Sequence, residues 1–299
     1  MFFRVFNSAK IFHGQPQKNF KIALLFAFFL TATTMLSYRH FFHAGNHADL
    51  LKHFVYAKCL ELLMQKEKAL LIIDTHAGAG FYSLENNKEW QNGVGKIYNQ
   101  ELPKTAQHYK NFIQKYLPKY YVGSPFIAQY FLREQDKLYL FEKHPTDFEI
   151  LKKNTKKQNN IFILKENGFD ALKKLLPPPS RRGIVLIDPP YETLSDYENI
   201  ITALKEGLKR FQTGVYLLWY PILNKKESAQ LPKRLLKLSQ QNYLNIQFKT
   251  KEKNDGFGLF GSGVFIINPP FQLFETAQEI LPIFSNYCAM DFEINAHIL

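Results

Sequence analysis

Continuous apolar runs alternate with amphipathic stretches along most of this chain. The runs are short and rich in β-branched residues, which is typical of strands buried on both faces of a sheet, and the stretches between them have helical spacing. This alternation predicts an α/β fold with a mostly parallel sheet. The predicted strands are 69–74, 138–141, 161–164, 184–187, 214–219, 244–250 and 263–267, and the predicted helices include 125–134, 146–156, 199–210 and 232–240.

The two ends of this pattern differ from its middle. The segment 254–258 reads Asn-Asp-Gly-Phe-Gly and predicts a turn, so the last two strands form a hairpin and complete a seven-stranded, Rossmann-like sheet whose last strand is antiparallel. Between the first two strands we predict a small helical insertion at about 86–122. Its apolar stripe faces the core, whereas its lysines are interleaved with tyrosines and could contact phosphates and bases. These lysines are Lys104, Lys110, Lys115 and Lys119.

The first predicted strand runs into a glycine-containing loop, Asp74-Thr-His-Ala-Gly-Ala-Gly80. Two glycines allow the backbone to approach a ligand closely, as in nucleotide-binding turns. The dinucleotide fingerprint is incomplete, because Ser83 stands where its third glycine would be. The loop therefore suits S-adenosylmethionine, which has no pyrophosphate, better than it suits NAD.

Polar residues also follow the next two predicted strands. Glu142 ends the second strand, where a carboxylate can bind both hydroxyls of an adenosine ribose. Asn167 follows the third strand and is placed to hydrogen-bond the adenine of a cofactor, while Gly168 permits a tight turn. Three successive strands that end in such residues predict one nucleoside-binding edge.

The fourth strand delivers the motif Asp188-Pro-Pro-Tyr191. The prolines stiffen the backbone and carry no N–H. The Asp188 side chain and the Pro189 carbonyl can accept the two hydrogens of an exocyclic amine, while Tyr191 stacks on a planar base. This tetrapeptide is similar to the signature of methyltransferases that act on the N6 of adenine. The plainer interpretation is a turn at a strand end with a helix-capping Asp.

A second motif, Asn268-Pro-Pro-Phe271, fits a looser form of the same signature. Ligands of open α/β sheets bind beside the first strand, where the strand order reverses. Asp188 ends the strand expected next to the first one, whereas Asn268 ends the last strand. We therefore interpret Asn268 as structural.

A helix is predicted to begin at Asn46 or His47, because polar residues precede an apolar pattern with helical spacing. We interpret Lys52 and His53 as projecting from it toward an anionic group, with Tyr38 at the mouth of a pocket; the alternative is a solvated helix. His43 and His47 are four residues apart, but nothing completes a metal-binding set, so we expect no metal.

The composition narrows the choice of partner and compartment. The formal net charge of +12 and the pI of about 9.4 favour a polyanion such as nucleic acid. The two cysteines, Cys59 and Cys288, form no metal-binding or redox pattern and fit a reducing cytoplasm.

Residues 1–34 differ from the rest of the chain. They carry basic residues, then an apolar run at 22–30 that is too short to span a membrane. We interpret this segment as an early start codon or a leader, because 35–299 reads as a cytoplasmic methyltransferase domain with no membrane segment.

From residue 35 to about 270 the chain resembles the RlmJ-type adenine N6-methyltransferases of 23S ribosomal RNA. The resemblance rests on motifs that occur in order, and the family's chains begin where Met35 stands. The motifs are Met35-Leu-Ser-Tyr-Arg-His40, Phe42-His-Ala-Gly-Asn-His-Ala-Asp49, Leu51-Lys-His53, the Asp74 loop, Gly123-Ser-Pro125, Leu132-Arg-Glu-Gln-Asp136, Ser180-Arg-Arg-Gly183, Asp188-Pro-Pro-Tyr-Glu192 and Trp219-Tyr-Pro221.

The resemblance implies S-adenosylmethionine as cofactor and 23S ribosomal RNA, or a ribosome assembly intermediate, as partner of a monomeric enzyme. It implies that Asp188 is catalytic and that Tyr38 contacts the substrate adenosine. The family usually has Asp where this chain has Asn167. The residues that would contact the cofactor are His53, His76, Ser124, Glu142, Asn167, Gly168 and Asp188.

Two other functions fit part of the pattern. A DNA adenine methyltransferase would share the chemistry, although no obvious target-recognition domain accompanies the short insertion. A non-enzymatic RNA-binding protein on a degenerate methyltransferase fold would not need the cofactor loop, the ribose carboxylate and the Asp188 loop together.

Overall fold

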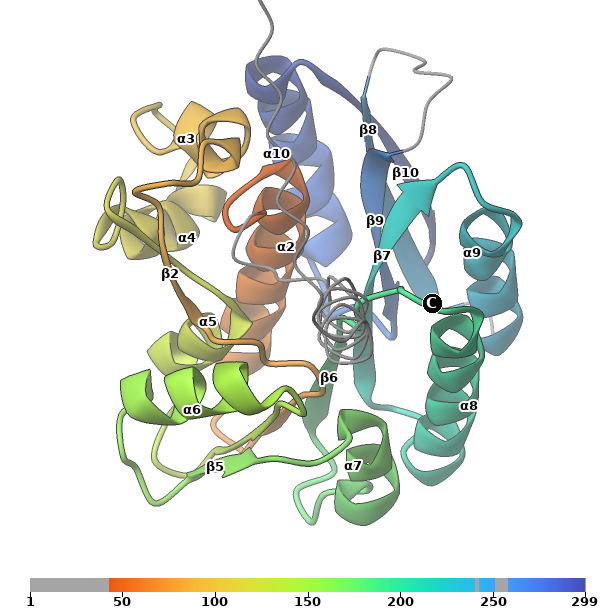
Figure 1. The fold of residues 1–299 in the computed structure, drawn as a ribbon. Helices are drawn as coiled ribbons and strands as arrows, with labels where there is room; N and C mark the ends of the chain where they lie inside the picture. The colour runs from red at the N-terminus through yellow and green to blue at the C-terminus, as the bar shows by residue number, and fades with distance from the viewer. Residues whose placement is uncertain (1–42, 240–241, 251–257, 299) are drawn as a thin grey trace, which may run out of the picture. The chain divides into compact units, whose positions relative to one another are not determined.

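The computed structural model describes residues 43–239, 242–250 and 258–298. An eight-stranded sheet forms the centre of the fold, in the spatial order β10-β8-β9-β7-β6-β1-β4-β5 (Figure 1). The strands β5, β4, β1, β6 and β7 are parallel, and β9, β8 and β10 continue the sheet in antiparallel pairs. The strands are β1 (Leu71–Asp74), β4 (Lys137–Phe141), β5 (Ile161–Leu164), β6 (Gly183–Ile187), β7 (Val215–Leu223), β8 (Tyr243–Thr250), β9 (Leu259–Ile267) and β10 (Met290–His297).

Helices pack on both faces of this sheet (Figure 1). The cluster of buried side chains on one face joins the sheet to α2, α5 and α10, and the cluster on the other face joins it to α7, α8 and α9. The helices are α2 (His47–Met64), α3 (Val94–Ile97), α4 (Lys104–Gln114), α5 (Ser124–Phe131), α6 (Pro145–Asn154), α7 (Gly168–Leu175), α8 (Leu194–Arg210), α9 (Lys226–Leu238) and α10 (Leu273–Cys288).

Alternate residues of the central strands supply the two cores. In β1, Ile72 belongs to the core under α2, whereas Leu71 and Ile73 belong to the core under α7 and α8. Both faces of β6 are covered in the same way, and all five of its residues are buried. This double burial explains why the central strands have continuous apolar sequences.

The predicted seven-stranded sheet is one strand short. The structure adds α10 and then β10, which pairs with β8 along the edge of the sheet. Most of the β10 side chains are exposed or half-buried, so its sequence lacks a continuous apolar run. Sequence periodicity identifies such an edge strand poorly, because the strand is held by pairing with its neighbour and not by burial of its own side chains.

The predicted insertion lies between β1 and β4. It contains η2 (Glu89–Asn92), α3 and α4, and it is bracketed by β2 (Phe81–Ser83) and β3 (Tyr120–Val122), which form a separate antiparallel pair. Buried residues of α3 and α4 share the core of α2 and α10. The insertion therefore packs on the helices of one face of the sheet.

The predicted helix near residue 47 is α2, and Asn46 caps it by accepting from the N–H groups of Ala48 and Asp49. Nearly all its residues from Ala48 to Leu60 are buried, so the alternative of a solvated helix is wrong. A charged side chain of this segment therefore needs its partners inside the protein.

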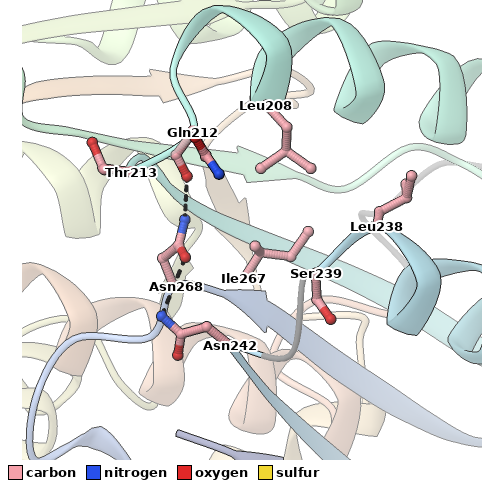
Figure 2. A pocket seen from close by; sticks show the side chains of 8 residues that line it. All are labelled: Leu208, Gln212, Thr213, Leu238, Ser239, Asn242, Ile267 and Asn268. Atoms are coloured by element: carbon pink, nitrogen blue, oxygen red, sulfur yellow. Dashed lines mark hydrogen bonds between the residues drawn. The ribbon is translucent and has the colours of Figure 1, made fainter. Parts of the chain in front are cut away.

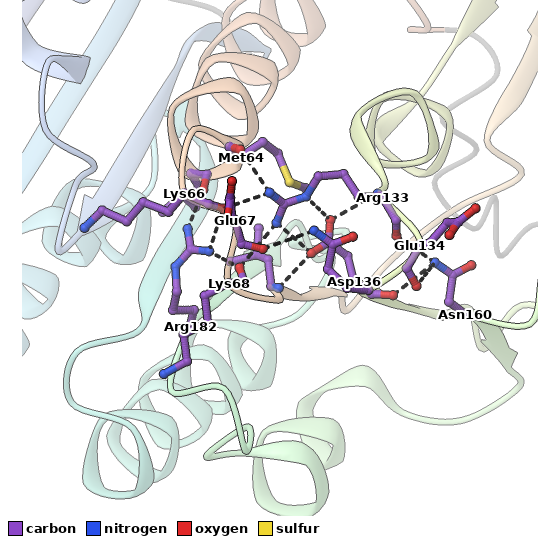
Figure 3. A network of polar contacts seen from close by, with 12 residues as sticks. Met64, Lys66, Glu67, Lys68, Arg133, Glu134, Asp136, Asn160 and Arg182 are labelled. Atoms are coloured by element: carbon purple, nitrogen blue, oxygen red, sulfur yellow. Dashed lines mark hydrogen bonds and ion pairs between the residues drawn. The ribbon is translucent and has the colours of Figure 1, made fainter.

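Two arginines satisfy the last carbonyls of α2 and of the loop after it (Figure 3). The Arg133 guanidinium donates to the carbonyls of Met64 and Lys66 at 3.0 and 2.8 Å and to the Asp136 carboxylate at 2.8 Å. Arg182 donates to the Leu63 carbonyl. Carbonyls at a helix end have no partner within the helix, so this network fixes the end of α2 opposite to Asn46.

Candidate active site

The carboxyl ends of β1, β4, β5 and β6 meet at one edge of the sheet. Asp74 is the last residue of β1, Glu142 follows β4, Asn167 follows β5 and Asp188 follows β6. Because β1 pairs in parallel with both β4 and β6, these polar groups lie on neighbouring strands at the same edge. The structure therefore brings the polar groups of the predicted edge together.

An ammonium group lies between two carboxylates at this edge. Lys52 Nζ is 2.7 Å from Asp188 Oδ2 and 2.9 Å from Asp49 Oδ1. The Lys52 and Asp49 side chains are only 5% and 1% exposed, whereas that of Asp188 is 18% exposed. Burial alone would lower the pKa of Lys52, but the two carboxylates outweigh it and raise the pKa. Lys52 is thus charged and holds one oxygen of Asp188.

Tyr191 anchors the Asp188 loop to the neighbouring strand β7. Its hydroxyl donates to the Trp219 carbonyl at 2.5 Å, and its ring meets the rings of Tyr197 and Trp219 edge-on. Tyr191 has φ of 56°, a conformation that non-glycine residues rarely adopt, and only 5% of the residue is exposed. In the structure Tyr191 and Pro189 are both buried, and they fix the loop. The predicted stacking of a substrate base on the Tyr191 ring would therefore require the loop to move.

A second buried carboxylate, Asp74, lies on the neighbouring strand. The Ser124 hydroxyl donates to its Oδ2 at 2.6 Å, and the His76 N–H donates to its Oδ1 at 3.3 Å. Burial raises the pKa of Asp74 to about 7, although the Ser124 hydrogen bond opposes this shift. Burial likewise lowers the pKa of His76 to about 4, so its imidazole is neutral at pH 7.

The loops after β1, β4 and β5 are joined through backbone groups. Gly78, with φ of 60°, donates its N–H to Glu142 Oε2 at 2.8 Å, and the His144 N–H donates to Oε1 at 2.6 Å. Burial raises the pKa of Glu142, and these two N–H groups oppose the shift. A Cβ on Gly168 would lie 2.0 Å from the Thr75 carbonyl oxygen, so only glycine fits there.

The remaining predicted residues lie in different surroundings. His53 is 1% exposed, and its Nδ1 is 2.5 Å from the Tyr121 hydroxyl. Asn167 is exposed and caps α7 by accepting from the Phe169 N–H. Tyr38 and the segment 1–34 lie outside the described residues. The structure thus joins Lys52 to Asp188, Ser124 and His76 to Asp74, and Glu142 to the glycine loop.

The second Pro-Pro motif lies at the opposite end of the strands from Asp188. Asn268 follows β9, whose end pairs with the beginning of β7. Its amide donates to the carbonyls of Gln212 and Gly214 at 2.7 and 2.8 Å and accepts from Asn242 at 3.2 Å, beside a pocket (Figure 2). Asn268 therefore ties three chain segments together, as a structural residue would.

Sequence reasoning assigned no role to Asp49 or Trp219. Asp49 lies three residues before Lys52 on the same helix, a spacing that brings side chains together and could have revealed the pair. The Trp219 ring centroid is 5.6 Å from Lys52 Nζ, and its carbonyl holds Tyr191. The contact between Trp219 and Lys52 has no local signal in the sequence, because β7 is remote in sequence from α2.

Neither a metal centre nor a membrane span is found in the part of the chain that the structure describes. It contains no group of three or more His, Cys, Asp or Glu side chains arranged to hold a metal ion. His43, considered as half of a metal pair, instead bonds Glu89 at 3.0 Å. None of the described helices has both the length and the apolar character needed to cross a membrane.

Comparison with known proteins identifies relatives over most of the chain. Residues 67–293 match the family model described as "Ribosomal RNA large subunit methyltransferase D, RlmJ". Proteins named "Ribosomal RNA large subunit methyltransferase J" from Haemophilus influenzae and Escherichia coli are 43% and 42% identical to this chain, covering 83% of it and 92% of each relative. A crystal structure of a Legionella pneumophila protein superposes with a TM-score of 0.81 at 32% identity, covering 85% of this chain and 98% of that one.

Proposed function

The chain belongs to the RlmJ family of ribosomal RNA large subunit methyltransferases, and on that premise we propose that it transfers a methyl group from S-adenosylmethionine to the N6 amine of an adenine in 23S ribosomal RNA. The substrate is the RNA itself or a ribosome assembly intermediate, and the enzyme acts as a monomer in the cytoplasm. The net charge of +12 supports a polyanionic partner.

The observation that carries the choice of N6 is the Asp188 carboxylate. It follows β6, the neighbour of β1, and its Oδ2 is held by the Lys52 ammonium at 2.7 Å. The N6 lone pair of adenine is delocalised into the ring, so the amine is a poor nucleophile. In our proposal Asp188 Oδ1 and the Pro189 carbonyl accept the two amine hydrogens and aim the lone pair at the methyl donor.

Lys52 orients Asp188 by donating to its Oδ2 at 2.7 Å. A hydrogen bond between oppositely charged groups is stronger than one between neutral groups. Asp49 holds the same ammonium at 2.9 Å, so Lys52 cannot readily turn away. The carboxylate need not be a strong base, because the methylated amine is cationic and loses its proton readily.

The residues at the strand ends suit S-adenosylmethionine, which supplies an electrophilic methyl group on a sulfonium. Glu142 accepts two backbone N–H groups, and its carboxylate still has lone pairs for two ribose hydroxyls. Gly78 brings backbone close to this carboxylate, and Gly168 brings backbone close to Thr75 in the loop after β1. Asp74 is a buried acid next to Ser124 and His76, and the positive charge of the methionine portion would favour its ionised form.

The target adenine must leave its helical stack to reach this edge. A loop or partly single-stranded RNA segment makes that step inexpensive, and stacking on aromatic side chains stabilises the extruded base. The family resemblance implies that Tyr38 contacts the substrate adenosine.

The two Pro-Pro motifs supply a matched experiment. We expect Asp188→Asn to lower methyl transfer from labelled S-adenosylmethionine to 23S RNA at least about 100-fold, because it weakens a group positioned for the transition state. Cofactor affinity, measured by calorimetry, should stay within a few-fold of wild type. The control Asn268→Asp should keep its activity per folded molecule. An Asp188→Asn enzyme with wild-type activity would refute the assignment.

A further inference from the structure

The helical insertion presents a surface with an unbalanced positive charge. No Asp or Glu occurs between Glu101 and Glu134, whereas four lysines occur in α4 and in the turn after it. Among the described residues, none of these lysines forms an ion pair. The lysines are Lys104, Lys110, Lys115 and Lys119.

Aromatic rings share this surface. Tyr130 is 42% exposed, and its ring lies 4.8 Å from Phe112 and 5.1 Å from Phe131. Phe81 contacts the rings of Tyr116, Tyr120 and Phe126 at centroid distances of 6.2, 4.9 and 5.7 Å. Apart from the buried Phe112, these rings are half-buried or exposed, so an array of ring edges and faces reaches solvent.

Two of the lysines lie over these rings. Lys115 Nζ is 4.9 Å from the centroid of Tyr130, and Lys119 Nζ is 5.2 Å from that of Tyr120. Each ammonium is held by its ring without a carboxylate to neutralise it. Each pair therefore presents a stacking surface and a phosphate-binding cation side by side, the combination with which proteins bind unpaired nucleic acid.

The surface is continuous with the cofactor loop. Phe81 directly follows Gly80, whose carbonyl accepts from the Gly123 N–H at 2.9 Å. A Cβ on Gly80 would lie 3.2 Å from the Phe126 ring, and Ser124, two residues before Phe126, bonds Asp74. A nucleic-acid strand bound across these aromatic rings would therefore run next to the strand ends that carry Asp74 and Asp188.

We propose that this surface, formed by Tyr116, Tyr120, Tyr130, Lys115 and Lys119, binds the unpaired RNA strand that flanks the target adenine. The inference rests on the proposed function, because the partner is the same RNA. The uncompensated lysines exclude a basic protein segment and favour a phosphate backbone, while the exposed and half-buried tyrosines can stack on bases irrespective of sequence.

Two variants test the surface. Tyr130→Leu keeps apolar packing on Phe112 but removes the stacking ring, and the double variant Lys115→Gln/Lys119→Gln removes the two cations. The control Lys205→Gln/Lys209→Gln changes the same charge on the exposed face of α8. Methyl transfer to a 23S RNA transcript is measured over a series of salt concentrations, with cofactor affinity and thermal melting measured in parallel.

We expect KM for the RNA to rise about 5-fold or more in Tyr130→Leu, the effect of losing one stacked base, with kcat and cofactor affinity unchanged. In the lysine variant the negative slope of log(kcat/KM) against log salt should become shallower by about 1.4, from two lost phosphate contacts. The control should match wild type.

Wild-type KM and salt dependence in both variants would overturn the inference while leaving the proposed function intact. Failure of the wild-type enzyme to methylate RNA would overturn the proposed function and, with it, this assignment of the partner.

Discussion

The hydrogen bond from Ser124 to Asp74 leads to a stability effect that depends on pH. The Asp74 side chain is completely buried, and the Ser124 hydroxyl bonds it at 2.6 Å. Burial raises the pKa of Asp74 to about 7, with the Ser124 bond opposing. Replacing Ser124 by Ala removes this opposition, so the pKa of Asp74 rises further.

The sign of the effect follows from the proton balance. Between pH 4 and 7 the unfolded chain has lost the Asp74 proton while the folded chain keeps it, so the free energy of unfolding falls as pH rises through this range. In Ser124→Ala the fall continues above pH 7, and each additional unit of pKa costs about 1.4 kcal/mol. The free energy of unfolding of Ser124→Ala should therefore be about 1 kcal/mol below that of wild type at pH 5.5, where the wild-type hydrogen bond joins two neutral groups. At pH 8.5, where that bond is charge-assisted, the difference should be about 2 kcal/mol.

Urea unfolding of the protein without cofactor, at both pH values, measures this difference. The control is Ser262→Ala, because Ser262 is fully buried in β9 and its hydroxyl has no partner among the described residues. The control should change stability equally at the two pH values. A loss in Ser124→Ala that is the same at pH 5.5 and pH 8.5 would refute the claim that this hydroxyl stabilises an ionised Asp74.

Two further predictions concern buried charges. Lys52→Met leaves Asp49 buried without its ammonium and should lower the free energy of unfolding by about 3 kcal/mol, and the double variant with Asp49→Asn should recover part of that loss in chemical denaturation. Equal stabilities of the single and double variants would contradict the pairing. Arg133→Leu, which strips donors from Asp136 and from carbonyls at the end of α2, should lower the thermal midpoint much more than Arg234→Leu, which breaks an exposed pair with Glu198. Similar midpoints in the two arginine variants would contradict the structural importance of the Figure 3 network.

Much of the fold and of the candidate site follows from strand patterns. The continuous apolar runs before Asp74, Glu142 and Asp188 are double-buried strands, and parallel strands bring their carboxyl ends to one edge. That geometry placed the polar groups correctly without any knowledge of side-chain contacts. The predicted strand order also distinguished Asp188, which ends the neighbour of β1, from Asn268, which ends a later strand.

Strand patterns could not predict contacts between segments that are distant in the sequence. Lys52 and Asp188 are 136 positions apart, and only the packing of α2 on the sheet brings them together. Edge strand β10 is held by β8 and lacks a core pattern of its own. The helix α9 begins before Pro232, which sequence rules place at a helix start but which here lies inside the helix.

The central claim is N6-methylation of a specific adenine, and nucleoside mass spectrometry of 23S RNA tests it most directly. The RNA, made without modifications, is incubated with the enzyme and labelled S-adenosylmethionine, then digested and analysed beside a duplex DNA substrate treated in the same way. We expect N6-methyladenosine at one site of the RNA and no methylated base in the DNA. Label on DNA alone, or on a base other than adenine, would contradict the account.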